Sequence, residues 1–366
     1  MSDFYELTVK EVISETADAK SIIFDIPTDL KDTFTYKAGQ YLTLSFDING
    51  KEERRAYSMS SSPLEDNIKV SVKRVFKGIV SNHINENIRS GQKVRVMPPA
   101  GRFVVDEAVS ATTFYLIGGG SGITPLLSIA KTVLEDKSNS DVRLLYGNKD
   151  EDNIIFHSEI DALASQYGDR FKVDHILAEP KKIKKKGIGG MFSKAKTNWA
   201  GWTGMPTSEV LTRFLDKHTT TKASLFYICG PGAMMDTAEQ YLLSKGYDDS
   251  IINLERFSSP NDSKPAAAAS SDATASTIKV TLKGETFDVF IPAGKTVLDS
   301  LLAAGKVPPF SCMTGACSTC CAKLESGTVD MENCFGLDNS DIEKGYILTC
   351  QASPTSNDVA INYDNI

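Results

Sequence analysis

The sequence has 366 residues, 41% of them hydrophobic and 24% charged; this exceeds the roughly 250 to 300 residues of one hydrophobic core, and the composition is typical of globular proteins. The net charge of -7 and the pI near 5.3 argue against nucleic-acid binding, which needs a concentrated basic face. No apolar run reaches the roughly 18 residues of a membrane helix, and the N-terminal residues do not resemble a signal peptide, so we expect a cytoplasmic protein of two or three domains without membrane attachment.

Residues 1–104 alternate short apolar strands with turns that contain Gly, Asn and Pro. We expect strands at Ala19–Ile26, Tyr41–Phe46, Ile68–Val75 and Lys93–Met97. This pattern predicts a small antiparallel β-barrel.

Arg55-Ala56-Tyr57-Ser58-Met59-Ser60-Ser61, expected at the turn after a barrel strand, resembles the R-x-Y-S-x-x-S signature of the ferredoxin-NADP reductase superfamily. Ala38-Gly39-Gln40-Tyr41 resembles the P-G-Q-[YF] element of the same superfamily, with Ala38 in place of proline. The resemblance implies that Arg55 binds the FAD pyrophosphate, that Tyr57 stacks on the isoalloxazine and that Ser58 reaches flavin N5. Alternatively, Tyr57 is a core aromatic residue and Arg55 a solvated charge.

Two further segments are assigned to the same cofactor. The candidate FAD-binding residues are Arg55, Ala56, Tyr57, Ser58, Val72, Lys73, Arg74, Gly78, Ile79, Val80 and Ser81. The last four stand at the entrance of a helix expected to run to Ile88, and a glycine before a helix N-terminus is a natural phosphate cradle.

Residues 105–257 alternate strands with helices. We expect strands at Thr113–Ile117, Val142–Tyr146, Phe171–Leu177 and Leu225–Cys229, and a helix at Leu126–Leu134. This alternation predicts a parallel sheet flanked by helices.

A glycine turn at residues 118–125 follows the first of these strands and precedes the helix, as a pyrophosphate site requires. Pro125 replaces the last glycine of the usual fingerprint, so the turn resembles the G-x-G-x-x-P form of the same superfamily, and Cys229-Gly230-Pro231 resembles its C-G-P element. The resemblance implies a nicotinamide dinucleotide site formed by Gly118, Gly120, Gly122, Thr124, Pro125, Gly230 and Pro231.

The segment Glu255-Arg256-Phe257 resembles the terminal E-x-F of the superfamily, whose aromatic residue lies near the flavin. Glu255 either orients the nicotinamide, relays a proton or is a salt-bridged carboxylate on an edge strand. Cys229 is read as a packing and positioning residue, because no histidine adjoins it in the sequence to activate it. The candidate catalytic residues are Tyr57, Ser58, Cys229, Glu255 and Phe257.

The choice between NADPH and NADH rests on few residues. The strand ending at Asn148 and Lys149 lacks the acidic residue that commonly holds a ribose 2'-hydroxyl, which favours NADPH. Five lysines in the insertion at residues 181–197 could add positive charge: Lys181, Lys182, Lys184, Lys185 and Lys186. Glu179 argues for NADH, because related NADPH enzymes often carry Ser-Arg there.

Residues 258–276 lack apolar periodicity and predict a flexible linker. In the module that follows, residues 277–366, we expect a hairpin at Ile278–Ile291 and a short helix at Val297–Ala304.

Cys312, Cys317 and Cys320 form a C-x4-C-x2-C pattern, and Cys350 follows. This is the plant-type spacing for a 2Fe-2S cluster, with the four thiolates as its metal ligands. A structural zinc site or buried thiols are the alternative, disfavoured because zinc sites usually add a second C-x2-C pair or histidines. Cys321 and Cys334 are expected to be buried and not to bind metal.

The order of the modules resembles the reductase components of multicomponent oxygenases, especially the reductase subunits of phenylacetyl-CoA epoxidases. The resemblance implies a multidomain protein: an antiparallel β-barrel for FAD, an α/β parallel sheet for NADPH or NADH, and a β-grasp ferredoxin of the α+β class. Its function would be to pass electrons from NAD(P)H through FAD and the cluster to an oxygenase or another one-electron acceptor.

Residues 277–366 carry 6 Lys and 11 Asp or Glu, a net charge of -5. We therefore expect this module to dock on a basic face of the acceptor protein. The alternatives are a stand-alone NAD(P)H oxidase or diaphorase, a ferredoxin-NADP reductase-like enzyme and a redox sensor. A substrate-specific dehydrogenase is disfavoured, because the four histidines are scattered along the sequence and each is expected to be a structural or surface residue and not a catalytic one.

Overall fold

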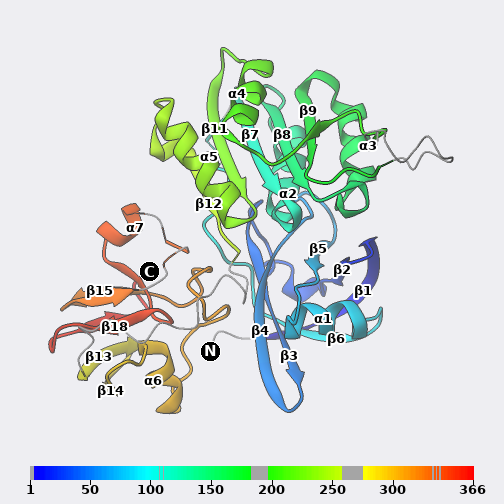
Figure 1. The fold of residues 1–366 in the computed structure, drawn as a ribbon. Coiled ribbons are helices and arrows are strands. Elements are labelled where there is room, and N and C mark those ends of the chain that lie inside the picture. Colours follow the sequence, from blue (N-terminus) through cyan, green and yellow to red (C-terminus); the bar gives the residue numbers. More distant parts are fainter. Residues whose placement is uncertain are drawn as a thin grey trace, which may run out of the picture.

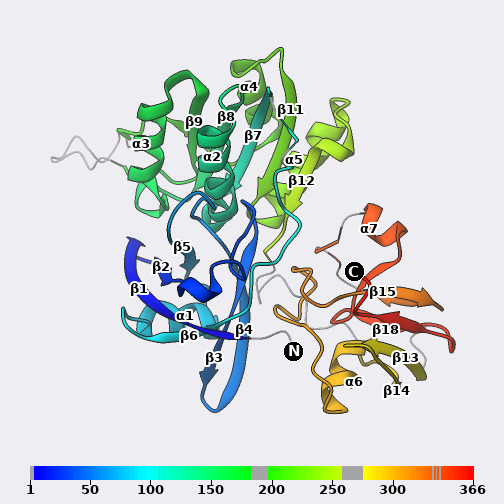
Figure 2. The same ribbon diagram turned by 180° about the vertical axis from the view of Figure 1, so that it is seen from behind.

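The computed structural model describes residues 4–106, 108–109, 111–182, 197–257, 275–331, 334, 336–337 and 339–366. These residues form three modules in chain order, each built on its own sheet (Figures 1 and 2). Within them, no helix has the length and apolar character needed to cross a membrane. Residues 258–274, most of the expected linker, and residues 183–196 lie outside the described ranges.

The first module is a six-stranded antiparallel sheet in the order β4-β3-β6-β1-β2-β5. Its strands are β1 (Tyr5–Thr16), β2 (Ala19–Asp25), β3 (Tyr41–Ile48), β4 (Lys51–Ser58), β5 (Ile68–Lys73) and β6 (Lys93–Val96), with helix α1 at Ile79–Asn87. An antiparallel bridge between Met59, just after β4, and Val70 of β5 joins the two edges and closes the sheet into a barrel. Alternate residues of the strands fill its interior, among them Leu42, Leu44 and Phe24.

The expectation that Arg55–Ser58 lies in a turn is wrong, because these residues belong to strand β4. β4 pairs with β3 along its whole length, from Lys51 opposite Ile48 to Ser58 opposite Tyr41. Asn49 and Gly50 connect the two strands with φ angles of 56° and 76°, the positive values that a tight hairpin turn requires. The Arg55–Ser58 part of the flavin motif therefore lies along a barrel strand and not in a turn.

The second module is a parallel sheet in the order β10-β9-β8-β7-β11-β12. The strands are β7 (Thr112–Gly119), β8 (Asp141–Asn148), β9 (Phe171–Leu177), β10 (Trp202–Thr203), β11 (Ala223–Cys229) and β12 (Ile252–Glu255). The helices are α2 (Ile123–Asp136), α3 (His157–Tyr167), α4 (Ser208–Lys217) and α5 (Gly232–Ser244). All eight residues of β7 are buried, as expected for a central strand covered on both faces.

Side chains on the two faces of this sheet belong to two separate hydrophobic clusters, one including α2 and α3 and the other α4 and α5. The order of the strands reverses at β7, because β8 lies on one side of it and β11 on the other. Ligands of open α/β sheets bind at such a switch point, outside the carboxyl ends of the strands.

The third module has a five-stranded mixed sheet in the order β14-β13-β19-β15-β17 and a small sheet of β16 and β18. Its strands are β13 (Ser276–Leu282), β14 (Glu285–Ile291), β15 (Cys321–Ser326), β16 (Val329–Met331), β17 (Tyr346–Leu348), β18 (Ala352–Pro354) and β19 (Ala360–Asn362). Its helices are α6 (Val297–Ala303) and α7 (Asn339–Glu343). β13 pairs in parallel with β19 and antiparallel with β14, and α6 packs on the sheet through Val297 and Leu301. This is the β-grasp arrangement.

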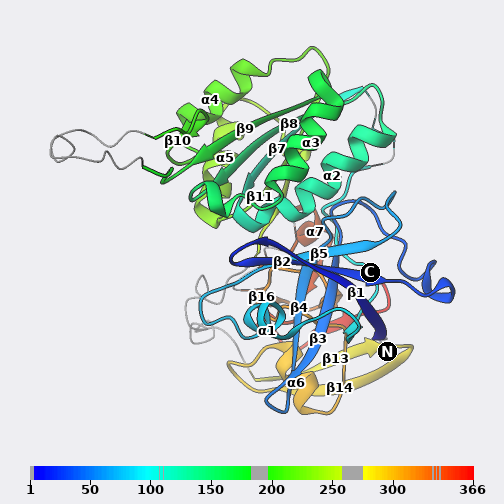
Figure 3. The same cartoon turned by 90° about the vertical axis from the view of Figure 1, so that its right-hand side faces the viewer.

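The third module, called the ferredoxin module below, lies beside the barrel. The parallel sheet lies above both in the orientation of Figure 1. Figure 3, turned by 90°, shows the same separation of the parallel sheet from the two lower modules. The carboxyl ends of β7, β11 and β12 therefore face the region where the barrel and the ferredoxin meet.

Candidate functional site

The four expected cluster ligands lie together in the ferredoxin module. Cys312, Cys317 and Cys320 lie on the segment between α6 and β15, and Cys350 follows β17. The Cys312 side chain contacts those of Cys317 and Cys350, and Cys320 also contacts Cys350. None of the four forms a disulfide. Three free thiols from one tight loop that converge with a fourth, Cys350, are the donor set that a 2Fe-2S cluster needs.

The backbone of this loop is also arranged for a sulfur ligand. The N–H groups of Thr314 and Cys317 point to Cys312 Sγ at 3.4 and 3.3 Å. Positive φ angles at Met313 (58°) and Gly315 (76°) allow the chain to wrap this closely. Hydrogen bonds from Cys317, Cys350 and Thr314 lower the pKa of Cys312, which favours the thiolate.

Cys321 and Cys334 stand apart from this set. Cys321 is buried on β15, and burial raises the pKa of its thiol to about 11. The pKa of the half-buried Cys334 is also raised by burial.

One cavity of about 310 Å³ is bounded by residues of all three modules. The barrel contributes Arg55, Ala56, Tyr57, Ser58, Lys73, Gly78, Ile79, Val80 and Ser81; the parallel-sheet module contributes Ser121, Thr124, Glu255 and Phe257; and the ferredoxin contributes Cys312, Thr314, Ala316 and Cys317. Flavin, nicotinamide and cluster candidates that are far apart in sequence thus share one space.

The barrel side of the cavity fits a flavin. Ser58 Oγ is buried and has no hydrogen-bond partner among the described residues, so a polar atom of a ligand would satisfy it. Burial raises the pKa of the Tyr57 hydroxyl, keeping the ring neutral. Arg55 donates to Arg54 O at 2.7 Å and to Glu53 at 3.4 Å.

Two of the candidate FAD residues do not line this cavity. Val72 is 1% exposed and its side chain packs in the barrel core. Arg74 forms an ion pair with Glu86. Side chains alternate along a strand, so Val72 and Arg74 point away from the cavity when Lys73 between them faces it.

The two glycine motifs of the nicotinamide site touch each other at the switch point. Gly118 of β7 is in register with Cys229 of β11. A Cβ added at Gly122 would lie 2.1 Å from Cys229 O, and one at Gly119 would lie 2.6 Å from Pro231 Cδ. Only glycine allows this approach, which leaves backbone exposed for a pyrophosphate.

The other residues of this motif support the turn. Gly120 has a φ of 53°, and Thr124 Oγ1 donates to Ser121 O at 3.0 Å. Pro125 lies in the first turn of α2, where its missing N–H costs nothing. A Cβ on Gly230 would lie 2.9 Å from Gly119 N.

Cys229 and Glu255 are neighbours in register on β11 and β12. Cys229 is fully buried, and burial followed by the nearby Glu255 charge raises the pKa of its thiol well above the usual value. A thiol held protonated in this way packs rather than attacks. Glu255 Oε2 is buried without a hydrogen-bond partner within the described ranges, and burial raises the pKa of this carboxyl to about 8.

Tyr41 also belongs to the site. The sequence placed it only in the Ala38-Gly39-Gln40-Tyr41 element and gave it no role. It is 3% exposed, lies in register with Ser58 and lines the shared cavity. Its hydroxyl is 2.8 Å from Thr319 Oγ1 of the ferredoxin, and Cys317 Sγ donates to the same Thr319 oxygen at 3.3 Å. Hydrogen bonds therefore link β3, which pairs with the strand of the flavin motif, to Cys317, an expected cluster ligand; Tyr41 and Thr319 are 278 residues apart in sequence.

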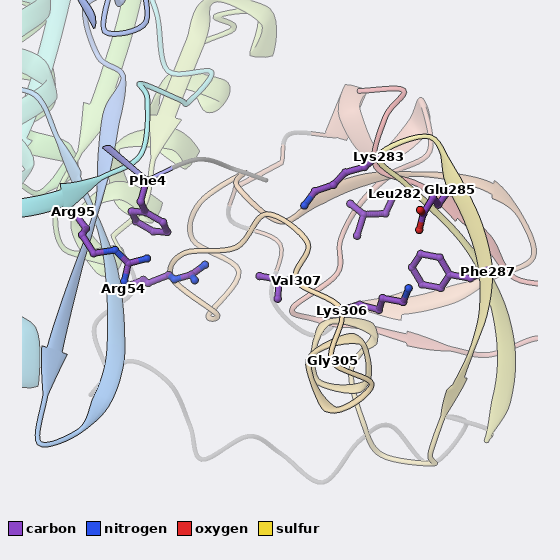
Figure 4. A pocket seen from close by; sticks show the side chains of 10 residues that line it. All are labelled: Phe4, Arg54, Arg95, Leu282, Lys283, Glu285, Phe287, Gly305, Lys306 and Val307. Atoms are coloured by element: carbon purple, nitrogen blue, oxygen red, sulfur yellow. The ribbon is translucent and has the colours of Figure 1, made fainter. Parts of the chain in front are cut away.

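Further contacts hold the ferredoxin against the barrel. Arg102 forms an ion pair with Asp341 of α7, and its guanidinium lies 4.9 Å from the Tyr346 ring centre. The Arg54 guanidinium lies 4.2 Å from the Phe310 ring centre. Figure 4 shows Arg54 beside Phe4 and Arg95 on the barrel side of a second cleft, of about 740 Å³, with ferredoxin residues opposite. The cluster loop thus faces the shared cavity in a docked arrangement.

Three family models match successive parts of the chain. An oxidoreductase FAD-binding domain matches residues 5–105, an oxidoreductase NAD-binding domain matches residues 116–240, and a 2Fe-2S iron-sulfur cluster binding domain matches residues 280–355. The three cofactor classes expected from the sequence are confirmed.

Curated relatives match over nearly the whole chain. The ferredoxin reductase component of 3-ketosteroid-9-alpha-monooxygenase from Rhodococcus rhodochrous is 38% identical, covering 98% of this chain and 96% of the relative. One of the subunits of 1,2-phenylacetyl-CoA epoxidase from Escherichia coli is 34% identical, covering 100% and 99%. The glycine betaine monooxygenase reductase subunit of Pseudomonas aeruginosa is 30% identical, covering 96% and 93%.

Solved structures share the fold. Phthalate dioxygenase reductase, described as a modular structure for electron transfer from pyridine nucleotides to 2Fe-2S, matches with a TM-score of 0.58 and 24% identity over 98% of both chains. An intact type IV self-sufficient cytochrome P450 monooxygenase matches 98% of this chain and 41% of its own length, with a TM-score of 0.68 and 20% identity. The expected multidomain architecture is confirmed.

Replacing Glu255 by Gln should change how stability depends on pH. Between its ordinary pKa of 4.5 and the raised value of about 8, the unfolded chain releases a proton that the folded protein keeps, so this group makes stability fall as pH rises through that window. Glu255→Gln should remove this slope when thermal unfolding is followed by circular dichroism at several pH values. The exposed Glu285→Gln is the matched control; an unchanged slope in Glu255→Gln would contradict the buried, protonated carboxyl.

Replacing Tyr41 by Phe, or Thr319 by Val, should slow cluster reduction without slowing flavin reduction. Loss of one net hydrogen bond, about 0.5–1.5 kcal/mol, corresponds to a fall of about two- to tenfold in the rate. Anaerobic stopped-flow absorbance separates the two steps, and the double variant should lose no more than Thr319→Val alone, because that variant already removes the Tyr41 contact. Tyr5→Phe, another barrel tyrosine, is the control. Additive losses, or equal slowing of flavin reduction, would contradict the role of this contact.

Proposed function

The chain belongs to the family of oxygenase reductase components that join an FAD-binding, an NAD-binding and a 2Fe-2S domain, and from this premise we propose how its own residues deliver electrons to a partner oxygenase. It is an oxidoreductase whose electrons come from a nicotinamide dinucleotide. When bound, FAD converts the two-electron hydride input into single electrons, which a 2Fe-2S cluster can carry. The observation that carries the proposal is the cavity of about 310 Å³ in which flavin, nicotinamide and cluster candidates from all three modules line one space.

The barrel residues hold and orient the flavin. Arg55 and the N-terminus of α1 at Ile79 neutralise the pyrophosphate, since a guanidinium and free helix N–H groups both favour anions. Tyr57 provides an aromatic face, and the unsatisfied Ser58 hydroxyl hydrogen-bonds the ring system. Lys73 Nζ lies 3.7 Å from Asp18 and close to the glycine turn at Gly120, so it adds positive charge between the two dinucleotide sites.

The parallel-sheet residues place the nicotinamide at the same cavity. The Gly118–Gly122 turn and Gly230-Pro231 bind the dinucleotide backbone, and the Cys229 backbone packs closely against Gly122 between them. Glu255 holds a proton in a buried position beside Cys229. Phe257, 37% exposed, covers the cavity next to these groups and keeps water from it.

NADPH is the proposed donor. β8 ends at Asn148, so no carboxylate at that position repels a 2'-phosphate. Of the insertion lysines, Lys181 is engaged with Asp152 at 2.5 Å, while Lys184, Lys185 and Lys186 lie outside the described residues. Lys149 and Lys182 are the cations proposed to attract the phosphate.

The acidic ferredoxin module is proposed to dock on a basic face of the oxygenase. Its net charge of -5 favours such an encounter. The cluster loop now faces the barrel, so the Tyr41–Thr319 and Arg102–Asp341 contacts have to open before that loop meets an acceptor. The linker expected at residues 258–276 would allow this exchange. The free cysteines suit a reducing compartment, so we place the protein in the cytoplasm.

Replacing the cluster ligand Cys350 by Ser should abolish electron delivery to the oxygenase and leave flavin reduction by NADPH at its normal rate. The flavin and nicotinamide sites are built by other modules, so they stay intact without the cluster. Stopped-flow absorbance measures flavin reduction, and turnover of the reconstituted oxygenase measures delivery. Cys334→Ser, which removes a thiol outside the ligand set, should behave as the original protein. If Cys350→Ser still oxidised NADPH with oxygen as fast as the original protein, and this was the main activity, the result would support a stand-alone oxidase.

Electron delivery to the oxygenase should slow as ionic strength rises. Opposite charges steer the encounter, and the screening length shrinks from about 30 Å at 0.01 M salt to about 10 Å at 0.1 M. The flavin-to-cluster step within the chain should change much less, because its partners are tethered. Equal rates of delivery at low and high salt would contradict acidic docking.

A further inference from the structure

Two of the four histidines, which lie on different elements of the parallel-sheet module, come together with a carboxylate. His157 is the first residue of α3, Asp161 follows one helical turn later, and His175 lies on β9. One donor atom from each of the three lies within 4.8 Å of the other two. The two imidazole ring centres are 5.6 Å apart. The fold thus assembles a group of nitrogen and oxygen donors that the sequence separates.

His175 is the unusual member of this group. Both of its ring nitrogens are buried without a hydrogen-bond partner in the described parts of the chain. A buried imidazole normally has a partner, as His218 shows: its Nε2 lies 2.6 Å from Asp174 Oδ2. The rings of Tyr146 and Trp199 lie 5.8 and 6.2 Å from that of His175 and offer it no such bond.

The charges around His175 also suit a ligand. Burial and the nearby His157 lower the pKa of His175 to about 4, so its imidazole is neutral near pH 7, the form that binds metals. Asp161 supplies a negative charge, with Oδ2 3.7 Å from His157 Nε2. Asp174, the other carboxylate of β9, is already bound to His218 and Lys217.

The positions of the other two donors allow them to close on an ion. His157 and Asp161 are spaced i and i+4, so they share one face of α3. Their side chains are 45% and 66% exposed, which leaves them free to turn toward His175. None of the three residues lines the shared redox cavity, so the group is separate from the flavin, nicotinamide and cluster sites.

We propose that His157, Asp161 and His175 bind one divalent transition-metal ion of the Zn²⁺ type. Two imidazoles and a carboxylate match the preference of Zn²⁺ for nitrogen and oxygen donors at about 2.0–2.2 Å, with water in the remaining position. The ion ties the start of α3 to the middle of β9. Its effect is to stabilise the parallel-sheet module, because a ligand that binds only the folded state raises the free energy of unfolding.

Cu²⁺ is the most informative probe of this site. The oxidised flavin and oxidised 2Fe-2S cluster are silent in electron paramagnetic resonance, so one equivalent of Cu²⁺ added to the oxidised holoprotein gives the only signal. Hyperfine coupling to imidazole nitrogen is the expected result, with displacement of the signal by Zn²⁺. A signal without nitrogen coupling, or with the features of thiolate ligation, would place the ion elsewhere and overturn the proposal.

Variants at the exposed ligands test the assignment without disturbing the core. His157→Ala and Asp161→Asn should each weaken Cu²⁺ binding by more than about tenfold, because even loss of an outer-shell partner typically costs 10- to 100-fold in affinity. His83→Ala, on α1 of the barrel, should bind as the original protein does.

Thermal unfolding provides a second readout that is independent of redox activity. Zn²⁺ should raise the unfolding temperature of the original protein and of His83→Ala, and leave that of His157→Ala unchanged. Equal metal affinity or an equal thermal shift in His157→Ala would show that these residues do not form the site.

Discussion

Contact between the loop that carries Cys312, Cys317 and Cys320 and the β3–β4 hairpin of the flavin motif is the constraint on which this molecule depends. The Tyr41 hydroxyl of β3 lies 2.8 Å from Thr319 Oγ1, which in turn lies 3.3 Å from Sγ of Cys317, one of the expected cluster ligands. Tyr41 lies opposite Ser58 of β4. One β-hairpin therefore positions both the Ser58 hydroxyl, expected to reach the flavin, and the tyrosine that contacts the cysteine loop. Because the contact is a hydrogen bond of modest net energy, it can position the ferredoxin and still release it to an acceptor.

The switch point of the parallel sheet supplies the second half of the site. Register between β7 and β11 brings Gly118 beside Cys229, and register between β11 and β12 brings Cys229 beside Glu255. The glycines keep the two turns in contact, while the buried thiol and carboxyl remain neutral near pH 7. Ser58 Oγ and Glu255 Oε2 are buried without hydrogen-bond partners among the described residues, and such polar atoms in a cavity suit ring systems with polar edges.

Local patterns in the sequence were sufficient for many elements. The strand at Phe171–Leu177 agrees with β9 at both ends, and the C-x4-C-x2-C spacing with Cys350 located the four converging thiols. Periodicity and metal-ligand spacing are local properties, so they can be read without tertiary information. The strand character of Arg55–Ser58 was missed, because it follows from pairing with β3 after the Asn49-Gly50 turn.

Other features depend on which parts of the chain meet in space. Val72 and Arg74 were grouped with Lys73, although only Lys73 of these three lines the cavity, together with Ser71 two residues earlier on β5. No pattern in the sequence joins Tyr41 to Thr319 or Arg102 to Asp341, since these contacts cross module boundaries. The pairing of His157 with His175 likewise depends on α3 packing over β9.

The central claim is that electrons enter at the nicotinamide, pass the flavin and only then reach the cluster. The most direct test is anaerobic mixing of the full-length protein with NADPH, and separately with NADH, while flavin and cluster absorbance are recorded together. The account predicts that NADPH bleaches the flavin first and the cluster afterwards, and that protein depleted of FAD shows no cluster bleaching. Reduction of the cluster without FAD, or a cluster that stays oxidised while the flavin is fully reduced, would contradict it.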